Sequence, residues 1–144
     1  MKSLLSTMLL VLGSCIYAQA DEIVGRWKTE KGQSHIEIFK KEGLYHGKIV
    51  WLEDNTNDDG SSPARDLNNP DQSKRQRTIE GLIILRDLRW TAEDQEWQEG
   101  KVYDPESGDT YDIFARLKDP NTLYLKGYIG ISLLGRSTLW SRID

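Results

Sequence analysis

The chain has 144 residues, of which 38% are hydrophobic and 29% charged, and its formal net charge is −4. This length suits one domain with a hydrophobic core, and the acidic balance argues against a nucleic-acid-binding surface. The only cysteine, Cys15, lies near the N-terminus, so the rest of the chain has to fold without a disulfide.

The N-terminal residues have the pattern of a secretory signal peptide. Lys2 precedes an apolar run, Leu4–Leu12, that is short for a membrane-spanning helix, and Ala18-Gln19-Ala20 gives the small-x-small pattern of a cleavage site. Cleavage is expected before Asp21, which divides the chain into a signal peptide, 1–20, and one domain, 21–144. The domain would have 18 basic and 23 acidic residues, a net charge of −5, and a periplasmic or secreted location.

A second interpretation of the leader remains open. The residues before Cys15, "LGS", loosely resemble a bacterial lipobox, in which case Cys15 would carry a lipid anchor. No later segment is apolar enough to cross a membrane as a helix.

The remainder of the chain is predicted to be β-structure, because its apolar residues recur with a period near two. Turn-forming residues separate the segments, which implies antiparallel neighbours joined in sequence. Eight strands with one apolar face each are best satisfied by closing into a single up-and-down antiparallel barrel; a two-sheet sandwich is the alternative. The expected strands are Glu22–Thr29, His35–Lys40, Leu44–Leu52, Leu82–Trp90, Trp97–Tyr103, Tyr111–Leu117, Leu123–Ile129 and Arg136–Ile143.

One long polar segment, Glu53–Arg77, interrupts the series of hairpins. Loops of this length are usually functional or mobile, so the segment is either a lid over the open end of a barrel or a plain surface loop. A second unusual connection contains Ile131–Leu134, which is apolar where a polar turn is expected. These two segments together support an alternative function as a protein-interaction or inhibitor module.

The first expected strand contains Gly25-x-Trp27, and the last contains Trp140-Ser141-Arg142. This pairing resembles the signature of lipocalins and their calycin relatives. The resemblance implies that Trp27 closes one end of the barrel, that Gly25 allows close approach of the chain, and that Arg142 stacks on Trp27.

Nearly the whole predicted domain also resembles a family of exported bacterial proteins known as domain of unknown function 2147. The matching pieces are "GRW", "LYHGKIVWL", "DLNNPD", "EGLIIL", "VYDPESGDTY", "LKGYIGISLLGRS" and "WSRI". The resemblance implies a lipocalin-like fold and carries no reaction, substrate or cofactor.

The best candidates for ligand contacts are residues that the period of two places inside the barrel. Tyr45, Trp51, Tyr111 and Trp140 share the phase of expected core residues, although aromatic side chains can also simply fill the core. Arg136 shares the phase of Trp140, and inside a barrel it would need an acid or a ligand carboxylate or phosphate as partner. At the rim it would instead be solvated. These residues predict a small, partly apolar or anionic ligand.

A calcium loop is a further hypothesis. Asn55, Asn57, Asp59 and Asp66 fall at positions one, three, five and twelve of the calcium-loop template, with Gly60 at position six. Asn replaces the first Asp and Asp replaces the final Glu, so any such site would be weak. An ordinary Asn/Asp/Gly loop is the alternative.

Enzymatic function has little support in the sequence. The two histidines, His35 and His46, are expected on the polar faces of neighbouring strands, and the acidic residues cluster in turns. The sequence therefore predicts non-enzymatic binding of a small ligand in the cell envelope, with no cofactor. An enzyme of unrecognised type remains the third possibility.

Overall fold

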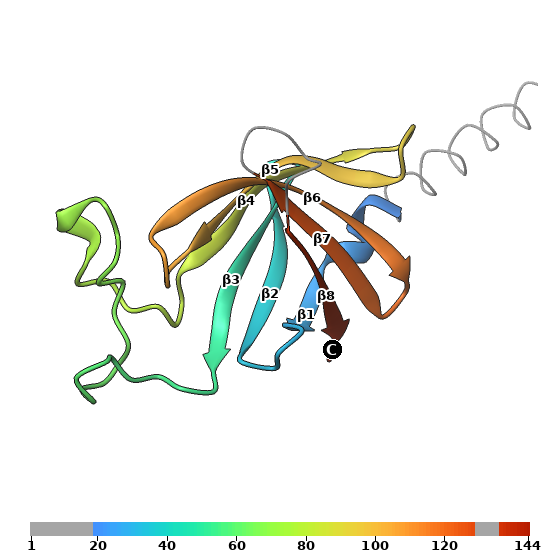
Figure 1. Cartoon of the computed structure of the whole chain (residues 1–144). Helices are drawn as coiled ribbons and strands as arrows, with labels where there is room; N and C mark the ends of the chain where they lie inside the picture. Colours follow the sequence, from blue (N-terminus) through green and yellow to red (C-terminus); the bar gives the residue numbers. More distant parts are fainter. Residues whose placement is uncertain (1–18, 129–135) are drawn as a thin grey trace, which may run out of the picture.

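The computed structural model describes residues 19–128 and 136–144 and shows eight antiparallel strands in a closed barrel. Each strand pairs with the next along the chain, and β8 returns to pair with β1 (Figure 1). The prediction of a single up-and-down barrel is confirmed. The strands are β1 (Gly25–Lys28), β2 (Ser34–Lys41), β3 (Leu44–Leu52), β4 (Ile83–Thr91), β5 (Glu96–Asp104), β6 (Asp109–Asp119), β7 (Thr122–Tyr128) and β8 (Arg136–Arg142).

Closure of the barrel excludes the sandwich alternative. In the β1–β8 pair, Trp27 lies opposite Arg142 and Lys28 lies opposite Ser141. Because β1 also pairs along its other edge with β2, neither of the terminal strands is left as an open sheet edge.

The core is the inner face of the barrel, built from alternate residues along the strands. Trp27, Trp97 and Tyr45 are its largest fully buried side chains. The other buried hydrophobic strand residues are Ile36, Ile38, Ile49, Ile84, Leu85, Leu88, Ile113, Ala115, Leu123, Leu125 and Trp140.

The first strand is shorter than the predicted Glu22–Thr29. Asp21–Ile23 forms a short 3-10 helix, labelled η1, and β1 starts only at Gly25. Ala20 is buried, and its carbonyl oxygen accepts a hydrogen bond from Trp97 Nε1 at 3.0 Å. Ala20, which precedes the cleavage boundary predicted before Asp21, therefore packs against the barrel and bonds to it.

The end of the barrel that carries η1 is plugged. Trp27 is fully buried and donates from Nε1 to the Ile23 carbonyl, while the Arg142 guanidinium lies 4.2 Å above the Trp27 ring. Gly25 has φ +142°, and a Cβ there would lie 2.7 Å from Arg142 Nη1 and 2.8 Å from the Asp144 backbone oxygen. A side chain at Gly25 would therefore force the stacked arginine to move.

Arg142 also ties three segments together at this end. Its guanidinium donates to the carbonyl oxygens of Glu22, Val24 and Pro120 at 2.5, 3.0 and 2.9 Å. These bonds provide hydrogen-bond donors to backbone carbonyls of the N-terminal segment and of the β6–β7 turn. We infer a structural role for the Gly-x-Trp sequence.

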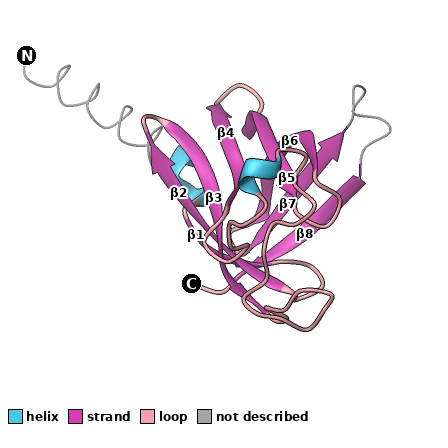
Figure 2. Cartoon of the chain, turned by 90° about the vertical axis from the view of Figure 1, so that its left-hand side faces the viewer, coloured by secondary structure: helices cyan, strands magenta, loops and turns pink. Residues whose placement is uncertain are grey.

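The opposite end carries the β1–β2 and β5–β6 turns and the long connection between β3 and β4. This connection contains a 3-10 helix, η2 (Gln72–Lys74), and projects on the side of the barrel away from η1 (Figure 1). Figure 2 views the barrel from the side of this connection. The apolar segment Ile131–Leu134, predicted as a possible interaction surface, lies outside the described residues.

A register shift in the β2–β3 pair corrects one predicted position. His35 pairs with Trp51 but Ile36 pairs with Ile49, so Val50 is an extra residue in β3. Such a bulge reverses the inward–outward alternation beyond it. Ile49 therefore faces the core, whereas Trp51 lies outside the barrel, 41% exposed, with its ring 4.4 Å from that of His35.

Candidate functional site

A cavity of about 590 Å³ opens at the end of the barrel opposite η1. Its walls come from the mouth ends of β2, β3, β4 and β5, from the long β3–β4 connection, and from the β5–β6 turn. The lining residues are Gln33, Ser34, Ile49, Leu52, Glu53, Asp54, Thr56, Asn57, Asp58, Ala64, Arg65, Leu67, Asn68, Ile79, Ile84, Val102, Tyr103, Asp104, Pro105 and Glu106.

The lining changes from apolar to polar between the strands and the loops. Ile49, Ile84 and Val102 supply an apolar floor from three strands, and the long connection adds Ile79 and Leu67. Most of the charged residues lie in the connection and the β5–β6 turn. Polar and charged residues make up more than half of the lining, so the site joins an apolar floor to a rim that is more polar than in most small-molecule sites.

A buried carboxylate fastens the long connection to the barrel. Asp66 is fully buried, and Tyr103 on β5 donates its hydroxyl to Asp66 Oδ1 at 2.5 Å. Asn69 Nδ2 and Arg77 Nη2 donate to Asp66 Oδ2 at 2.8 and 3.0 Å. We call these four side chains the Asp66 latch. Its parts are separated in sequence, and together they hold the loop against the cavity wall.

The latch holds Asp66 in its charged form. Burial alone would raise the pKa of Asp66, but hydrogen bonds from Tyr103, Asn69 and Arg77, with the Arg77 charge, leave this pKa below its usual value. Burial and the hydrogen bond to Asp66 raise the pKa of Tyr103 to about 12. At neutral pH the latch therefore contains a carboxylate anion and a protonated tyrosine.

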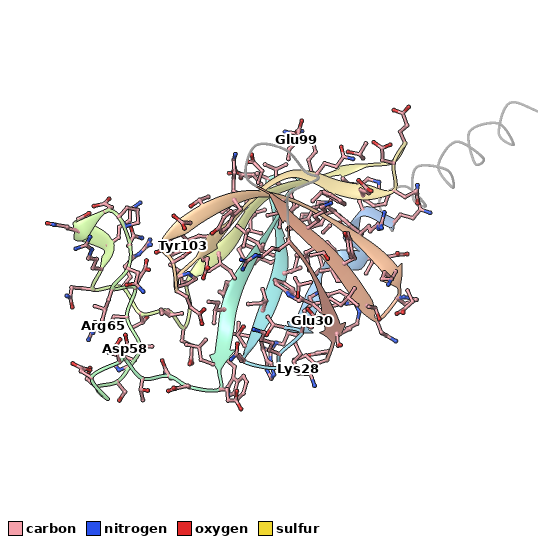
Figure 3. The ribbon with its side chains drawn as sticks, viewed as in Figure 1. Lys28, Glu30, Asp58, Arg65, Glu99 and Tyr103 are labelled. Atoms are coloured by element: carbon pink, nitrogen blue, oxygen red, sulfur yellow. The ribbon has the colours of Figure 1, made fainter. Side chains whose placement is uncertain are left out.

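A second attachment joins the connection to the β5–β6 turn. Asn68 Nδ2 donates to the carbonyl oxygens of Pro105 and Glu106 at 3.3 and 2.9 Å. Gly108 has φ +77°, and a Cβ there would lie 2.1 Å from the Asn68 carbonyl oxygen. Close approach of the two loops thus requires glycine at this position. Figure 3 shows Arg65 in the connection and Tyr103 at the adjoining edge of the barrel.

Tyr45 does not line this cavity. It lies at the plugged end, where its ring packs edge-on against Trp97 and its hydroxyl donates to Asp21 Oδ1 at 2.5 Å. Burial and this hydrogen bond raise the pKa of Tyr45. Phase alone placed Tyr45 inside the barrel but could not indicate at which depth.

Three further ligand candidates, Tyr111, Arg136 and Trp140, do not line the mouth cavity. Trp140, which is buried, and Arg136, which is exposed, line a smaller space of about 130 Å³ together with Ile113 and Leu125. Tyr111 is half-buried on β6, and its hydroxyl lies 3.4 Å from an Asp109 carboxylate oxygen. With Tyr45 plugging the far end and Trp51 outside, none of the five predicted ligand residues lines the larger cavity.

The four predicted calcium ligands are engaged in protein hydrogen bonds. Asn55 Oδ1 and Asn57 Oδ1 accept from the backbone amides of Ala64 and Arg65, and Asp59 Oδ1 accepts from the amide and hydroxyl of Ser61. Asp66 belongs to the latch instead. Within the described residues, no group of three or more His, Cys, Asp or Glu side chains could hold a metal ion. These oxygens thus have protein donors in the structure, and the calcium site stays a prediction.

The cavity-lining residues that sequence reasoning missed had recognisable but weak signals. Ile84 and Val102 lie within predicted strands, and Tyr103 ends one, but nothing local indicates that these positions meet at the mouth of the barrel.

The two histidines lie on outer faces: His35 stacks on Trp51, and His46 Nδ1 accepts a hydrogen bond from the Asp87 amide at 3.2 Å. No helix in the described part of the chain is long and apolar enough to cross a membrane.

Comparison with known proteins places the chain in a family. A solved structure described as "Protein HP1028 from the human pathogen Helicobacter pylori belongs to the lipocalin family" superposes with a TM-score of 0.72 at 23% identity, covering 85% of this chain and 83% of that one. This similarity supports the lipocalin-like fold. None of the curated proteins compared matches the chain. The family model described as "Uncharacterized protein conserved in bacteria (DUF2147)" matches residues 25–142, and the chain belongs to this family.

Proposed function

We propose that this protein binds a small, partly apolar molecule in the mouth cavity, without chemical conversion. The observation that carries the proposal is the cavity itself, whose volume of about 590 Å³ is within the usual range for small-molecule sites. The apolar floor would hold a hydrocarbon or ring portion, and the polar rim would hold a hydrophilic end. The leader pattern supports placing this binding in the cell envelope.

The attached loop supports the same proposal. Most residues of the segments 53–58 and 64–68 in the β3–β4 connection line the cavity, and the Asp66 latch joins this connection to β5. A loop fixed in this way presents a preformed site, which reduces the ordering cost of binding. This observation favours the lid hypothesis over a plain surface loop.

A cavity-filling variant tests the proposal. Val102 is half-buried on β5 and lines both this cavity and the smaller space, so the ring of Val102→Phe should reduce the volume open to a ligand. We expect the neutral fluorescent probe N-phenyl-1-naphthylamine to bind the unmodified protein and to bind Val102→Phe at least about tenfold more weakly. Thermal unfolding of both proteins controls for a loss of fold.

Two results would overturn the proposal. One is failure of the unmodified protein to bind any apolar probe. The other is equal binding by Val102→Phe with its fold intact, since the probe would then occupy a different place. Native mass spectrometry of protein purified from its own cell envelope would show the mass of a retained natural ligand.

A further inference from the structure

The charges around the mouth cavity select the class of ligand. We propose that the cavity takes a cationic amphiphile: a small molecule with a positively charged nitrogen at the rim and an apolar chain or ring on the floor. This inference rests on the proposed function of the same cavity. It replaces the expectation of an anionic ligand that the sequence suggested.

Acidic side chains predominate in the lining. Three carboxylates, of Glu53, Asp54 and Asp58, come from the long connection, and two, of Asp104 and Glu106, come from the end of β5 and the turn after it. They meet a single lining cation, Arg65. The carboxylates thus come from two different segments at the rim, and Figure 3 shows one of them, Asp58, in the long connection near Arg65.

The carboxylates are not neutralised by the protein. None of these five acids forms an ion pair within the described residues, and Glu53, Asp58 and Glu106 are exposed. Asp54 and Asp104 accept hydrogen bonds from neighbouring amides and hydroxyls of their own turns, which leaves their negative charge in place. The rim therefore keeps a negative potential toward the cavity.

Arg65, the lining arginine, binds a backbone carbonyl of the long connection. Arg65 Nη1 donates to the Gln76 carbonyl oxygen at 2.7 Å, an interaction that orders the long connection. The second arginine considered from the sequence, Arg136, lines the smaller space instead. A ligand carboxylate or phosphate in the mouth cavity would thus meet five negative charges and a single guanidinium, one of whose N–H groups already binds the Gln76 carbonyl.

The floor distinguishes an organic cation from an inorganic one. Ile49, Ile84 and Val102 offer a bound metal ion no oxygen from their side chains, and hydrocarbon is their natural partner. An ammonium or guanidinium group attached to an apolar portion satisfies both regions at once. The same molecule with an anionic head group would still contact the apolar floor, but the carboxylates of the rim would repel its charge.

Three matched amphiphiles test this inference by isothermal titration calorimetry below their micelle concentrations. They share a ten-carbon chain and differ in the head group: decyltrimethylammonium, decyl glucoside and decyl sulfate. We expect the cation to bind about tenfold more tightly than the sulfate, or about 1.4 kcal/mol at 25 °C. Since the rim is exposed, raising salt from about 20 to about 300 mM should reduce this preference.

A charge-removing variant locates the effect. Glu53→Gln with Asp58→Asn removes two exposed rim charges whose side chains have no hydrogen bond to any residue in 19–128 or 136–144, so the fold should be unaffected. Glu42→Gln with Glu93→Gln removes the same charge from turns at the plugged end and is the matched control. We expect the rim variant to lose most of the cation preference and the control variant to keep it.

The outcomes separate the two proposals. Equal or stronger binding of decyl sulfate, or an unchanged preference in the rim variant, would overturn the inference while leaving ligand binding in the cavity intact. Failure of all three amphiphiles to bind would instead count against the proposed function, and with it the inference. If the control variant lost the cation preference as well, the net charge of the protein, and not the rim, would be responsible, and the inference would fail.

Discussion

Removal of one hydroxyl from the Asp66 latch should open the long connection. Tyr103→Phe keeps the ring against the barrel and deletes the donor to the buried Asp66 carboxylate. Asn69 and Arg77 still donate to this carboxylate, so it would not be left without partners. A hydrogen bond to a charged group contributes about 1.5–3 kcal/mol, so we expect a loss of about 2 kcal/mol.

Loss of this hydrogen bond should release the long connection before it unfolds the barrel. If the connection can detach while the barrel stays folded, a loss of about 2 kcal/mol increases the detached population about 30-fold. Trypsin reports this directly, because Lys74 and Arg75 lie in the connection and Arg75 Nε is bound to the Asn69 carbonyl in the attached state. Cleavage there should accelerate by about the same factor, provided that opening is fast compared with cleavage.

The pH dependence provides an independent check. Because the folded pKa of Asp66 is depressed, its contribution is present above the unfolded value of about 3.9 and is lost as pH falls through the folded value. The raised pKa of Tyr103 acts at the other extreme: its contribution is complete below about pH 10 and is lost as pH rises through about 12. The difference in urea unfolding free energy between the unmodified protein and Tyr103→Phe should therefore be largest near neutrality and shrink as the pH falls below the unfolded value of about 3.9.

Two results would refute the latch. One is an unchanged tryptic rate together with a difference in unfolding free energy below about 0.5 kcal/mol, within the range of ordinary surface substitutions. The other is a difference that persists undiminished at low pH. Tyr124→Phe is the matched control, since Tyr124 is half-buried on β7 and its hydroxyl makes no hydrogen bond within the part of the chain that the structure describes. This control should leave cleavage in the connection unchanged.

Three other predictions concern the plugged end and the calcium hypothesis. Trp27→Ala should cost about 3–5 kcal/mol in urea unfolding, because a fully buried ring and its contact with Arg142 are lost; a stable variant that had lost only ligand binding would contradict the structural role. A protein beginning at Asp21 lacks the Ala20 carbonyl that accepts from Trp97, and should be about 1 kcal/mol less stable than one beginning at Gln19; equal unfolding midpoints would show that water or the new terminus replaces this bond. Millimolar calcium should leave the melting temperature unchanged, since the loop's oxygens are already engaged; a clear rise would restore the calcium site.

The sequence was sufficient for the fold because the pleat of a strand is a local property. Side chains alternate between faces every two residues, so the period of two predicted eight strands, and β3 has the predicted bounds of Leu44–Leu52. Polar turns between the strands then implied antiparallel neighbours, and eight half-apolar strands favoured closure, although only the structure excluded a two-sheet sandwich. The same rule failed at Trp51, because one extra residue in β3 reversed the alternation after Ile49.

The site depended on contacts that no local pattern contains. Asp66 lies in a polar loop and was predicted to be a calcium ligand, yet Tyr103, 37 residues away, makes it a buried anchor. Tyr45 has the phase of a barrel-lining residue, but only the packed structure shows that it plugs the far end against Trp97. Phase tells which face a side chain takes; it does not tell the depth along the barrel or the partner across it. Those are fixed by register and loop closure between distant segments, so the cavity and its acidic rim emerged only from the tertiary structure.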